Sequence, residues 1–233
     1  MPLKKSKGNM YDWTTHTHSL LKGKCPHECQ YCYVQAMSKK SPNMKNRYGN
    51  GKIELVETEL MVDYGKDKVI FIEHMNDLFA KDVPSDIILA VLDHCNEYPH
   101  SKYVFQTKNP QRYAEFALKL PNIDETILGT TIESNRIYNI MGKTPSPFNR
   151  LIGINHMSKY YDTFITIEPI LDFDLNEFTD MIVWANPKFV NIGADSKGHG
   201  LIEPSYDKIM ALYNNLCEKH IEVRKKINLD RLK

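Results

Sequence analysis

Three cysteines lie close together in the run CPHECQYCY, at Cys25, Cys29 and Cys32. Thiolates at this spacing can ligate one metal centre, and cysteine thiolates are the usual ligands of iron–sulfur clusters. A cluster of four irons bound by only three protein thiolates keeps one iron free for another ligand. The run therefore predicts a metal centre with an open coordination position, and such a position indicates chemistry.

A structural zinc site is the alternative, in which His27 or another histidine completes a closed tetrahedron with the three thiolates. Zinc ligands usually come as two separated pairs rather than one short triplet, which favours the cluster. The remaining cysteines, Cys95 and Cys217, fall in predicted helices near apolar neighbours, where we expect small buried hydrophobes. The five cysteines are an odd number and no apolar core follows the basic first residues, so we expect a cytoplasmic protein without disulfides.

Short apolar runs recur along the chain and predict the strands that position this loop. They show no polar alternation, which is typical of strands buried on both faces of a parallel sheet. The predicted strands cover 17–21, 69–72, 103–105, 126–128, 164–167 and 189–192.

Helix-start signals stand between these runs. Asn109 and Pro110 form an N-cap with a first-turn proline, Ser146 and Pro147 repeat the device, and Ser85 and Ser205 precede apolar positions with helical spacing. The resulting order is six βα units in a row. This order predicts an α/β fold with a parallel sheet and right-handed crossovers, either an open doubly wound sheet or a curved partial barrel.

The whole chain, residues 1–233, is expected to form a single domain because no Pro/Ser/Gly-rich linker divides it. Residues 38–52 are polar and turn-rich and predict a flexible loop, and residues 221–233 form a basic C-terminal tail. A net charge of +1 argues against a strongly basic nucleic-acid binder, although local patches are compatible with it. The apolar runs are too short to span a membrane.

Polar residues follow each predicted strand. Because the carboxyl ends of strands in barrel-like α/β folds converge on one mouth, these residues are expected to form a polar rim around a pocket. Polar residues also mark ordinary strand-to-loop transitions, and that interpretation stays open for each of them. The candidates are Glu73, His74, Lys108, Thr131, Glu133, Ser134, Glu168 and Asp195.

The C-x3-C-x2-C pattern, with Tyr31 before the last cysteine and Tyr33 after it, resembles the signature of the radical S-adenosylmethionine (SAM) enzymes. The resemblance implies a partial (β/α)6 TIM-like barrel with the cysteine loop after its first strand. It also implies a [4Fe-4S] cluster on the three cysteines, SAM at the open iron, and a flavodoxin or ferredoxin as electron donor.

Three further segments, 76–79, 107–110 and 167–172, resemble a branch of small radical SAM proteins. This branch is often phage-associated, is distantly similar to spore photoproduct lyase, and has no settled substrate.

The resemblance also implies roles for the rim residues. Glu73 and His74 occupy the place where the family contacts the SAM amino group, although this chain lacks the glycines of that segment. Ribose contacts come from the end of the fourth strand, where Thr131, Glu133 and Ser134 stand. The remaining roles are Tyr31 near the adenine, Lys108 on the SAM carboxylate or a substrate anion, and Glu168 and Asp195 toward the cofactor or the substrate.

The implied reaction is reductive cleavage of SAM to a 5′-deoxyadenosyl radical, which abstracts hydrogen from a substrate. The basic segments and the distant likeness to the lyase favour a nucleotide or nucleic acid as that substrate. A small metabolite or peptide remains an alternative, and so does a zinc-stabilised binding protein without catalysis.

Overall fold

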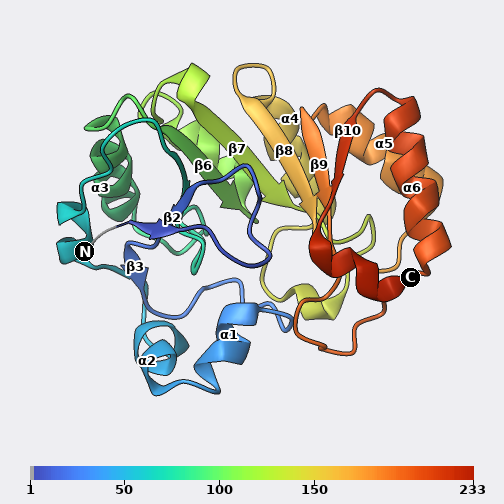
Figure 1. Ribbon diagram of the computed structural model, residues 1–233, viewed down its shortest axis with the longest axis horizontal. Helices are drawn as coiled ribbons and strands as arrows, with labels where there is room; N and C mark the ends of the chain where they lie inside the picture. Colours follow the sequence, from blue (N-terminus) through green and yellow to red (C-terminus); the bar gives the residue numbers. More distant parts are fainter. Residues whose placement is uncertain (1–2) are drawn as a thin grey trace.

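An open sheet of eight strands forms the centre of the computed structural model, which describes residues 3–233 (Figure 1). The strand order is β1-β2-β5-β6-β7-β8-β9-β10, and all neighbours are parallel except the first pair. Their bounds are β1 Lys4–Lys5, β2 His16–His18, β5 Val69–Ile72, β6 Lys102–Thr107, β7 Thr126–Thr131, β8 Asp162–Ile167, β9 Phe189–Ile192 and β10 Glu222–Lys225.

The predicted parallel α/β fold is confirmed, and the sheet is a partial barrel because β1 and β10 do not pair with each other. Five of the six predicted strands lie within β5 to β9. The first, expected at 17–21, is shorter: β2 ends at His18, and Leu21 belongs to a separate hairpin of β3 (Leu21–Lys22) with β4 (Glu54–Leu55). β10 adds a seventh parallel strand, which the six-unit pattern did not include.

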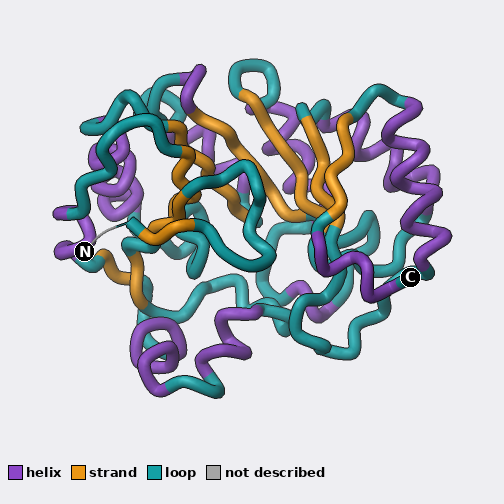
Figure 2. The backbone as a smooth tube through the Cα atoms, in the orientation of Figure 1, coloured by secondary structure: helices purple, strands orange, loops and turns teal. Residues whose placement is uncertain are grey.

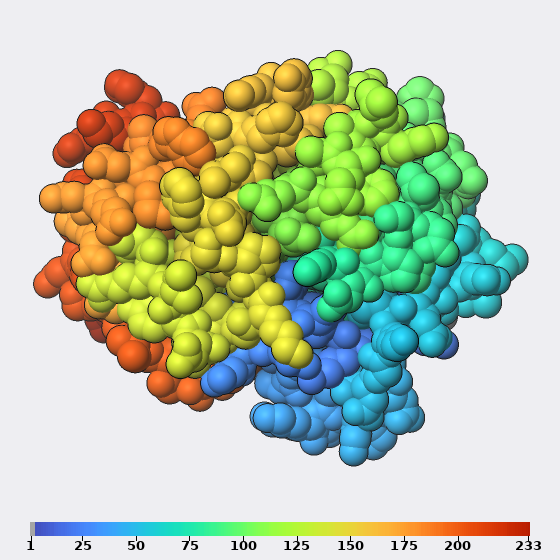
Figure 3. All heavy atoms as spheres, turned by 180° about the vertical axis from the view of Figure 1, so that it is seen from behind, coloured from blue at the N-terminus to red at the C-terminus, as the bar shows by residue number. Residues whose placement is uncertain are grey.

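Helices cover the convex face of the sheet, as the tube in Figure 2 and the rear view in Figure 3 show. Ser146 caps α4 by accepting a hydrogen bond from the backbone N–H of Asn149, and Ser205 caps α6 in the same way with Lys208. The segment after Pro110 is a short 3₁₀-helix rather than an α-helix. The outer helices are α3 Ser85–Asn96, η3 Pro110–Phe116, α4 Pro147–Met157, α5 Leu175–Ala185 and α6 Tyr206–Glu218.

Residues 38–52, expected to be a flexible loop, contain short helical turns. Arg47 fixes this segment to the body of the protein, since its guanidinium lies 3.0 Å from Glu59 Oε1 and donates to the carbonyl of Ser19. The helical elements on the N-terminal side of the sheet are α1 Tyr33–Ser38, α2 Pro42–Met44, the π-helix η1 Lys45–Gly49 and the 3₁₀-helix η2 Glu57–Met61.

The expected C-terminal tail is also ordered, because it forms β10 and the 3₁₀-helix η6 (Ile227–Leu232). The two short 3₁₀-helices that remain are η4 (Ile123–Glu125) and η5 (Asn139–Met141). Cys95 is buried as predicted, but Cys217 is exposed on α6, which corrects the expectation of a buried side chain there.

The concave face of the sheet is filled by the N-terminal segment. The ring of Tyr11 packs between Phe71 and Phe164, and its hydroxyl contacts Gln106 Oε1 at 2.6 Å and Thr166 Oγ1 at 2.5 Å. In Figure 1 this segment crosses in front of the strands between β2 and β10. The interior of the partial barrel is therefore plugged from the chain's own start.

No helix in the described part of the chain, residues 3–233, is long and apolar enough to cross a membrane.

Candidate active site

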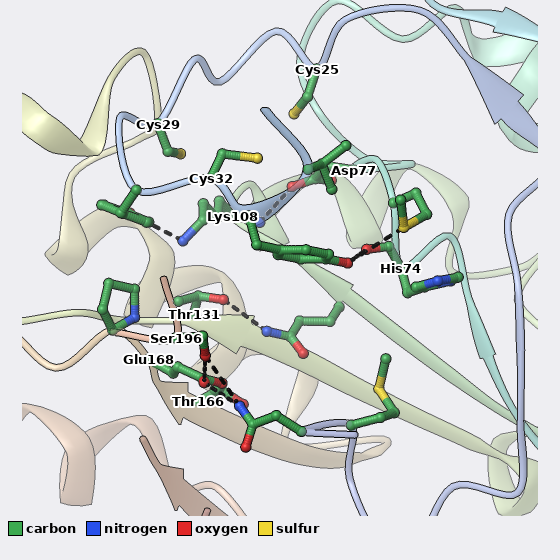
Figure 4. Close-up of a pocket in the computed structure, with 18 of the residues that line it drawn as sticks. Cys25, Cys29, Cys32, His74, Asp77, Lys108, Thr131, Thr166, Glu168 and Ser196 are labelled. Atoms are coloured by element: carbon green, nitrogen blue, oxygen red, sulfur yellow. Dashed lines mark hydrogen bonds between the residues drawn. The ribbon is translucent and has the colours of Figure 1, made fainter. Parts of the chain in front are cut away.

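A cavity of about 450 Å³ opens at the carboxyl ends of the strands, beneath the cysteine loop (Figure 4). The loop of residues 23–32 runs from β3 to α1 and brings all three cysteines to the cavity wall. Opposite them, the wall is built from the ends of β5, β6, β7 and β8. The cavity therefore lies where the rim of strand-end residues was predicted.

The three thiols face one open space without converging on a single point (Figure 4). All three are free; Cys29 is buried and the other two are partly exposed. Burial raises the pKa of the Cys25 and Cys29 thiols above the ordinary range. Among residues 3–233, no three His, Cys, Asp or Glu side chains are grouped closely enough to bind one metal ion.

Asp77 ties the cysteine loop to the sheet. Its Oδ2 lies 2.8 Å from His27 Nε2 and accepts the backbone N–H of Lys108, and its Oδ1 accepts the hydroxyl of Thr107 at 2.6 Å. Burial opposes ionisation, but His27 and these hydrogen bonds together hold the pKa of Asp77 below its usual value. Nε2 of His27 is therefore bound by Asp77 and is not available as a zinc ligand in the alternative site.

The loop after β7 holds the cysteine loop from the other side. The backbone N–H of Gln30 donates to the carbonyl of Ile140 at 2.9 Å, and that of Lys143 donates to the carbonyl of His27 at 2.7 Å. Gly142 lies between these bonds with φ +70°, and a Cβ built on it would stand 2.2 Å from the His27 carbonyl oxygen. Only glycine allows this close approach of the two backbones.

Glu133 does not line the cavity but is the centre of a buried ion cluster behind it. Arg150 Nη1 lies 2.7 Å from one carboxylate oxygen, and Lys108 and the Tyr31 hydroxyl both bind the other. Burial opposes its ionisation, yet Arg150 and Lys108 hold the pKa of Glu133 at about 2. Lys108 and Tyr31 do reach the cavity, so this cluster sets their positions.

Glu73 and His74, predicted at the SAM amino group, both line the cavity at the end of β5. Glu73 has φ +62°, so it adopts the left-handed conformation that favours glycine. Its Oε2 accepts the backbone N–H groups of Leu20 and Leu21, while its Oε1 is buried without a partner. Burial raises the pKa of Glu73 to about 8 and lowers that of His74 to about 4.

Of the predicted ribose contacts, only Thr131 lines the cavity. Its hydroxyl accepts a hydrogen bond from the Gln106 amide at 2.8 Å. Ser134 is buried beyond the wall, where its hydroxyl donates to the carbonyl of Asp172. Glu133 and Ser134 thus do not line the space in which we expected them to bind, because their side chains are bound by Arg150 and by the carbonyl of Asp172.

Glu168 and Asp195 stand on the side of the cavity opposite the cysteines. Glu168 binds Lys226 Nζ at 2.8 Å and the amides of Asn9 and Asn228, each at 2.6 Å. Asp195 instead organises its own loop, with its carboxylate on the ring and backbone N–H of His199. Both carboxylates are therefore already bound by protein groups.

Several site residues escaped the sequence reasoning. Arg150 sits among apolar residues of α4, and nothing in its spacing distinguishes it from a solvated arginine. Tyr11 and Asn9 precede the first predicted strand, 17–21, where no pattern indicated that the chain folds back into the barrel. Asp77 did carry a signal, since it follows a strand, but its partners come from two distant segments, at His27 and at Thr107 and Lys108.

Solved structures with a similar fold include spore photoproduct lyase and a radical SAM methyltransferase. A variant of spore photoproduct lyase superposes with a TM-score of 0.64 over 96% of this chain and 78% of its own, at 10% identity. A second variant, with bound AdoMet and dinucleoside spore photoproduct, gives 0.58 over 95% and 67%, at 11% identity. A radical SAM methyltransferase from Sphaerobacter thermophilus gives 0.52 over 95% and 69%, also at 11%.

The chain thus shares the fold of these proteins, which confirms the expected fold class. The chain belongs to the family described as "protein of unknown function (DUF5131)", whose model matches residues 9–185. No curated protein matches the sequence.

Proposed function

We propose that this protein is a radical SAM enzyme, with a [4Fe-4S] cluster on Cys25, Cys29 and Cys32 and SAM in the adjoining cavity. The observation that carries the proposal is the placement of three free thiols around one space at the mouth of a radical SAM fold. A zinc ion needs its ligands at about 2.0–2.3 Å from one point, whereas thiolates on a cluster bind different irons. The spread of the three sulfurs supports the cluster.

The surroundings also fit these groups. Thiolates are the ligating form, so the iron charges would offset the burial that raises the pKa of Cys25 and Cys29. Lys108 and Arg150 carry two positive charges against the single carboxylate of Glu133, which leaves a cation beside the cavity for an anionic cluster or a carboxylate. An ammonium group beside the unpartnered Oε1 of Glu73 would favour the ionised carboxylate, which would accept its hydrogen bond.

When bound, the cluster and SAM would supply the electron and the 5′-deoxyadenosyl radical that abstracts a substrate hydrogen. The protein's part is to position these groups and to exclude water. Tyr31, Lys108 and Thr131 would hold SAM from the strand ends, and Glu73 and His74 from β5. Glu168 and Asp195, on the far wall, would face the substrate. A flavodoxin or ferredoxin would deliver the electron, and we expect the protein to work in the cytoplasm as a single domain.

For the substrate we favour a nucleotide or nucleic acid over a small metabolite or peptide. One structural neighbour holds a dinucleoside spore photoproduct, and lysines reach the cavity from several segments of this chain. A substrate bearing phosphates would complement them.

The first test is electron paramagnetic resonance of anaerobically reconstituted, dithionite-reduced protein, with and without SAM. We expect a reduced-cluster signal that changes when SAM is added. Alanine at any one of the three cysteines should abolish SAM cleavage, whereas Cys95→Ala is the matched control and should keep it. A colourless protein that contains zinc and gives no cluster signal would instead establish the binding-protein alternative and overturn this proposal.

A further inference from the structure

The basic residues that the sequence offered for contact with anions are mostly engaged elsewhere. In the C-terminal segment, Arg231 pairs with Glu203 and Lys226 with Glu168. Arg224 pairs with Glu222 and lies over the ring of Phe189, 3.8 Å from its centroid. Arg47 pairs with Glu59, and no lysine of residues 38–52 lines the cavity. Neither segment therefore presents free charge at the cavity mouth.

Four other lysines carry free charge at the cavity mouth or beside it. Lys7 and Lys197 are exposed residues of the cavity wall, while Lys4 and Lys5 are exposed on β1. Within residues 3–233, none of the four lies within 4.0 Å of a carboxylate oxygen. A lysine without a carboxylate partner is free to bind an anionic ligand.

These lysines form one continuous rim. Lys4, Lys5 and Lys7 line a second hollow that shares Lys7, Met10 and His74 with the main cavity, so the two spaces adjoin. The Lys7 loop meets the Lys197 loop through Asn9, whose amide lies 3.4 Å from Ser196 Oγ. We call Lys4, Lys5, Lys7 and Lys197 the lysine rim.

The charge of the lysine rim affects the pKa of two neighbouring histidines. After burial, which is the largest cause, Lys4 contributes to the lowered pKa of His74; Lys68 and Lys5 act likewise on His16 after its own burial. Lys4 and Lys5 thus contribute positive potential at these two rings.

We propose that the lysine rim binds successive phosphates of a single nucleic-acid strand, one nucleotide of which enters the cavity. This inference rests on the proposed function and names its substrate class as a strand rather than a free nucleotide. A single cation would suffice for a mononucleotide, whereas lysines from β1, from the loop after it and from the loop after β9 span several phosphates. Such binding is electrostatic and falls with salt.

The test is fluorescence anisotropy with a labelled oligothymidylate of about twelve nucleotides and with a dinucleotide, over a range of salt concentrations. We expect the longer strand to bind more tightly. Replacing Lys4, Lys5 and Lys7 together by alanine should weaken its binding about tenfold and lower the slope of log K against log salt by about 2. The matched control is Lys119→Ala with Lys159→Ala, two exposed lysines among the outer helices.

Equal binding by the rim variant and the control variant would overturn the inference, as would a dinucleotide that binds as tightly as the long strand. The cluster signal and its response to SAM, measured on the same variants, separate this result from the proposed function. Lost strand binding with an intact SAM response is the expected pattern. If the wild type binds no strand but still responds to SAM, the lysine rim is refuted while the radical SAM assignment stands.

Discussion

At the scale of single residues, the site is built from charges that are buried and bound rather than free. Glu133 is ionised and Glu73 is protonated, and their binding partners explain the difference. Glu133 stays ionised because two cations bind it, whereas Glu73 receives only two backbone N–H groups and its pKa rises to about 8. The same residue type is therefore held in opposite protonation states after two strands, in the cavity wall at Glu73 and behind it at Glu133.

Glu73 gives the protein a pH dependence with a defined sign. Between its ordinary pKa of 4.5 and its folded pKa of about 8, the unfolded chain has lost this proton and the folded chain keeps it. Folding stability should therefore fall as pH rises through this range, by a few kcal/mol at most. Glu73→Gln should remove that loss. Urea unfolding at pH 5 and pH 8 measures this change in the free energy of unfolding, and the exposed Glu218→Gln is the control. The same change with pH in wild type and in Glu73→Gln would contradict the prediction.

Glu133→Gln should lower the free energy of unfolding. The amide keeps the shape of the side chain but leaves Lys108 and Arg150 buried without a counter-charge, which costs about 3–5 kcal/mol. Chemical denaturation near pH 7 measures the loss. Asp174→Asn, which breaks the exposed pair with Arg136, is the control and should change stability far less. A similar loss in both variants would mean that burial does not set the strength of the Glu133 cluster.

At the scale of elements, the cysteine loop owes its position to two neighbours rather than to its own sequence. Asp77 holds it to the sheet, and the loop after β7 pairs with it through Gln30 and Lys143. The loop also packs on apolar residues of distant segments, since Cys29 and Tyr31 form a buried cluster with Met141 and Leu171. Its geometry is therefore set by segments that lie about fifty and a hundred residues away along the chain.

Gly142→Ala tests this support. The new Cβ would meet the His27 carbonyl at 2.2 Å and would also strain a backbone at φ +70°, so the two loops must separate. We expect reconstituted protein to bind less than half the iron of the wild type, measured by iron analysis, with a lower unfolding midpoint. Gly198→Ala is the matched control, because its φ is +67° and nothing lies within 4 Å of its Cβ. Equal iron content in the two variants would show that the loop tolerates the displacement.

Element by element, the sequence predicted much of the fold because its signals are local. Apolar runs marked β5 to β9, and Ser146 and Ser205 marked two helix starts that the structure confirms. Most of the predicted rim residues line the cavity, because strands end in polar residues. Glu133 and Ser134 do not line it, and no local signal in the sequence distinguishes them from Thr131, which does.

At the scale of the whole molecule, the start and the end of the chain meet inside the partial barrel. Asn9 and Asn228 both donate to Glu168, and Lys226 lies over the ring of Tyr11. These contacts join residues 60 or more positions apart, so periodicity within a window of sequence could not reveal them. The single-domain prediction is compatible with this closure.

Tyr11→Phe tests whether the N-terminal segment stabilises the barrel. Losing the hydroxyl leaves the acceptor of Gln106 and the hydroxyl of Thr166 buried without this partner, at a cost of about 1–3 kcal/mol. Thermal unfolding should report a lower midpoint. Tyr160→Phe, on an exposed ring, is the control and should leave the midpoint unchanged. An unshifted midpoint in Tyr11→Phe would mean that the N-terminal segment does not contribute to the stability of the barrel.

Because the sheet does not close, it keeps two edges, and unpaired backbone groups on an edge can recruit a strand from another molecule. Both edges are short and charged: β1 consists of Lys4 and Lys5 alone, and β10 carries Glu222, Arg224 and Lys225. A β-strand of another copy would have to bury these charges to extend the sheet. The open barrel is thereby protected from edge-to-edge aggregation without a covering element, and Lys4 and Lys5 provide this protection whatever else they bind.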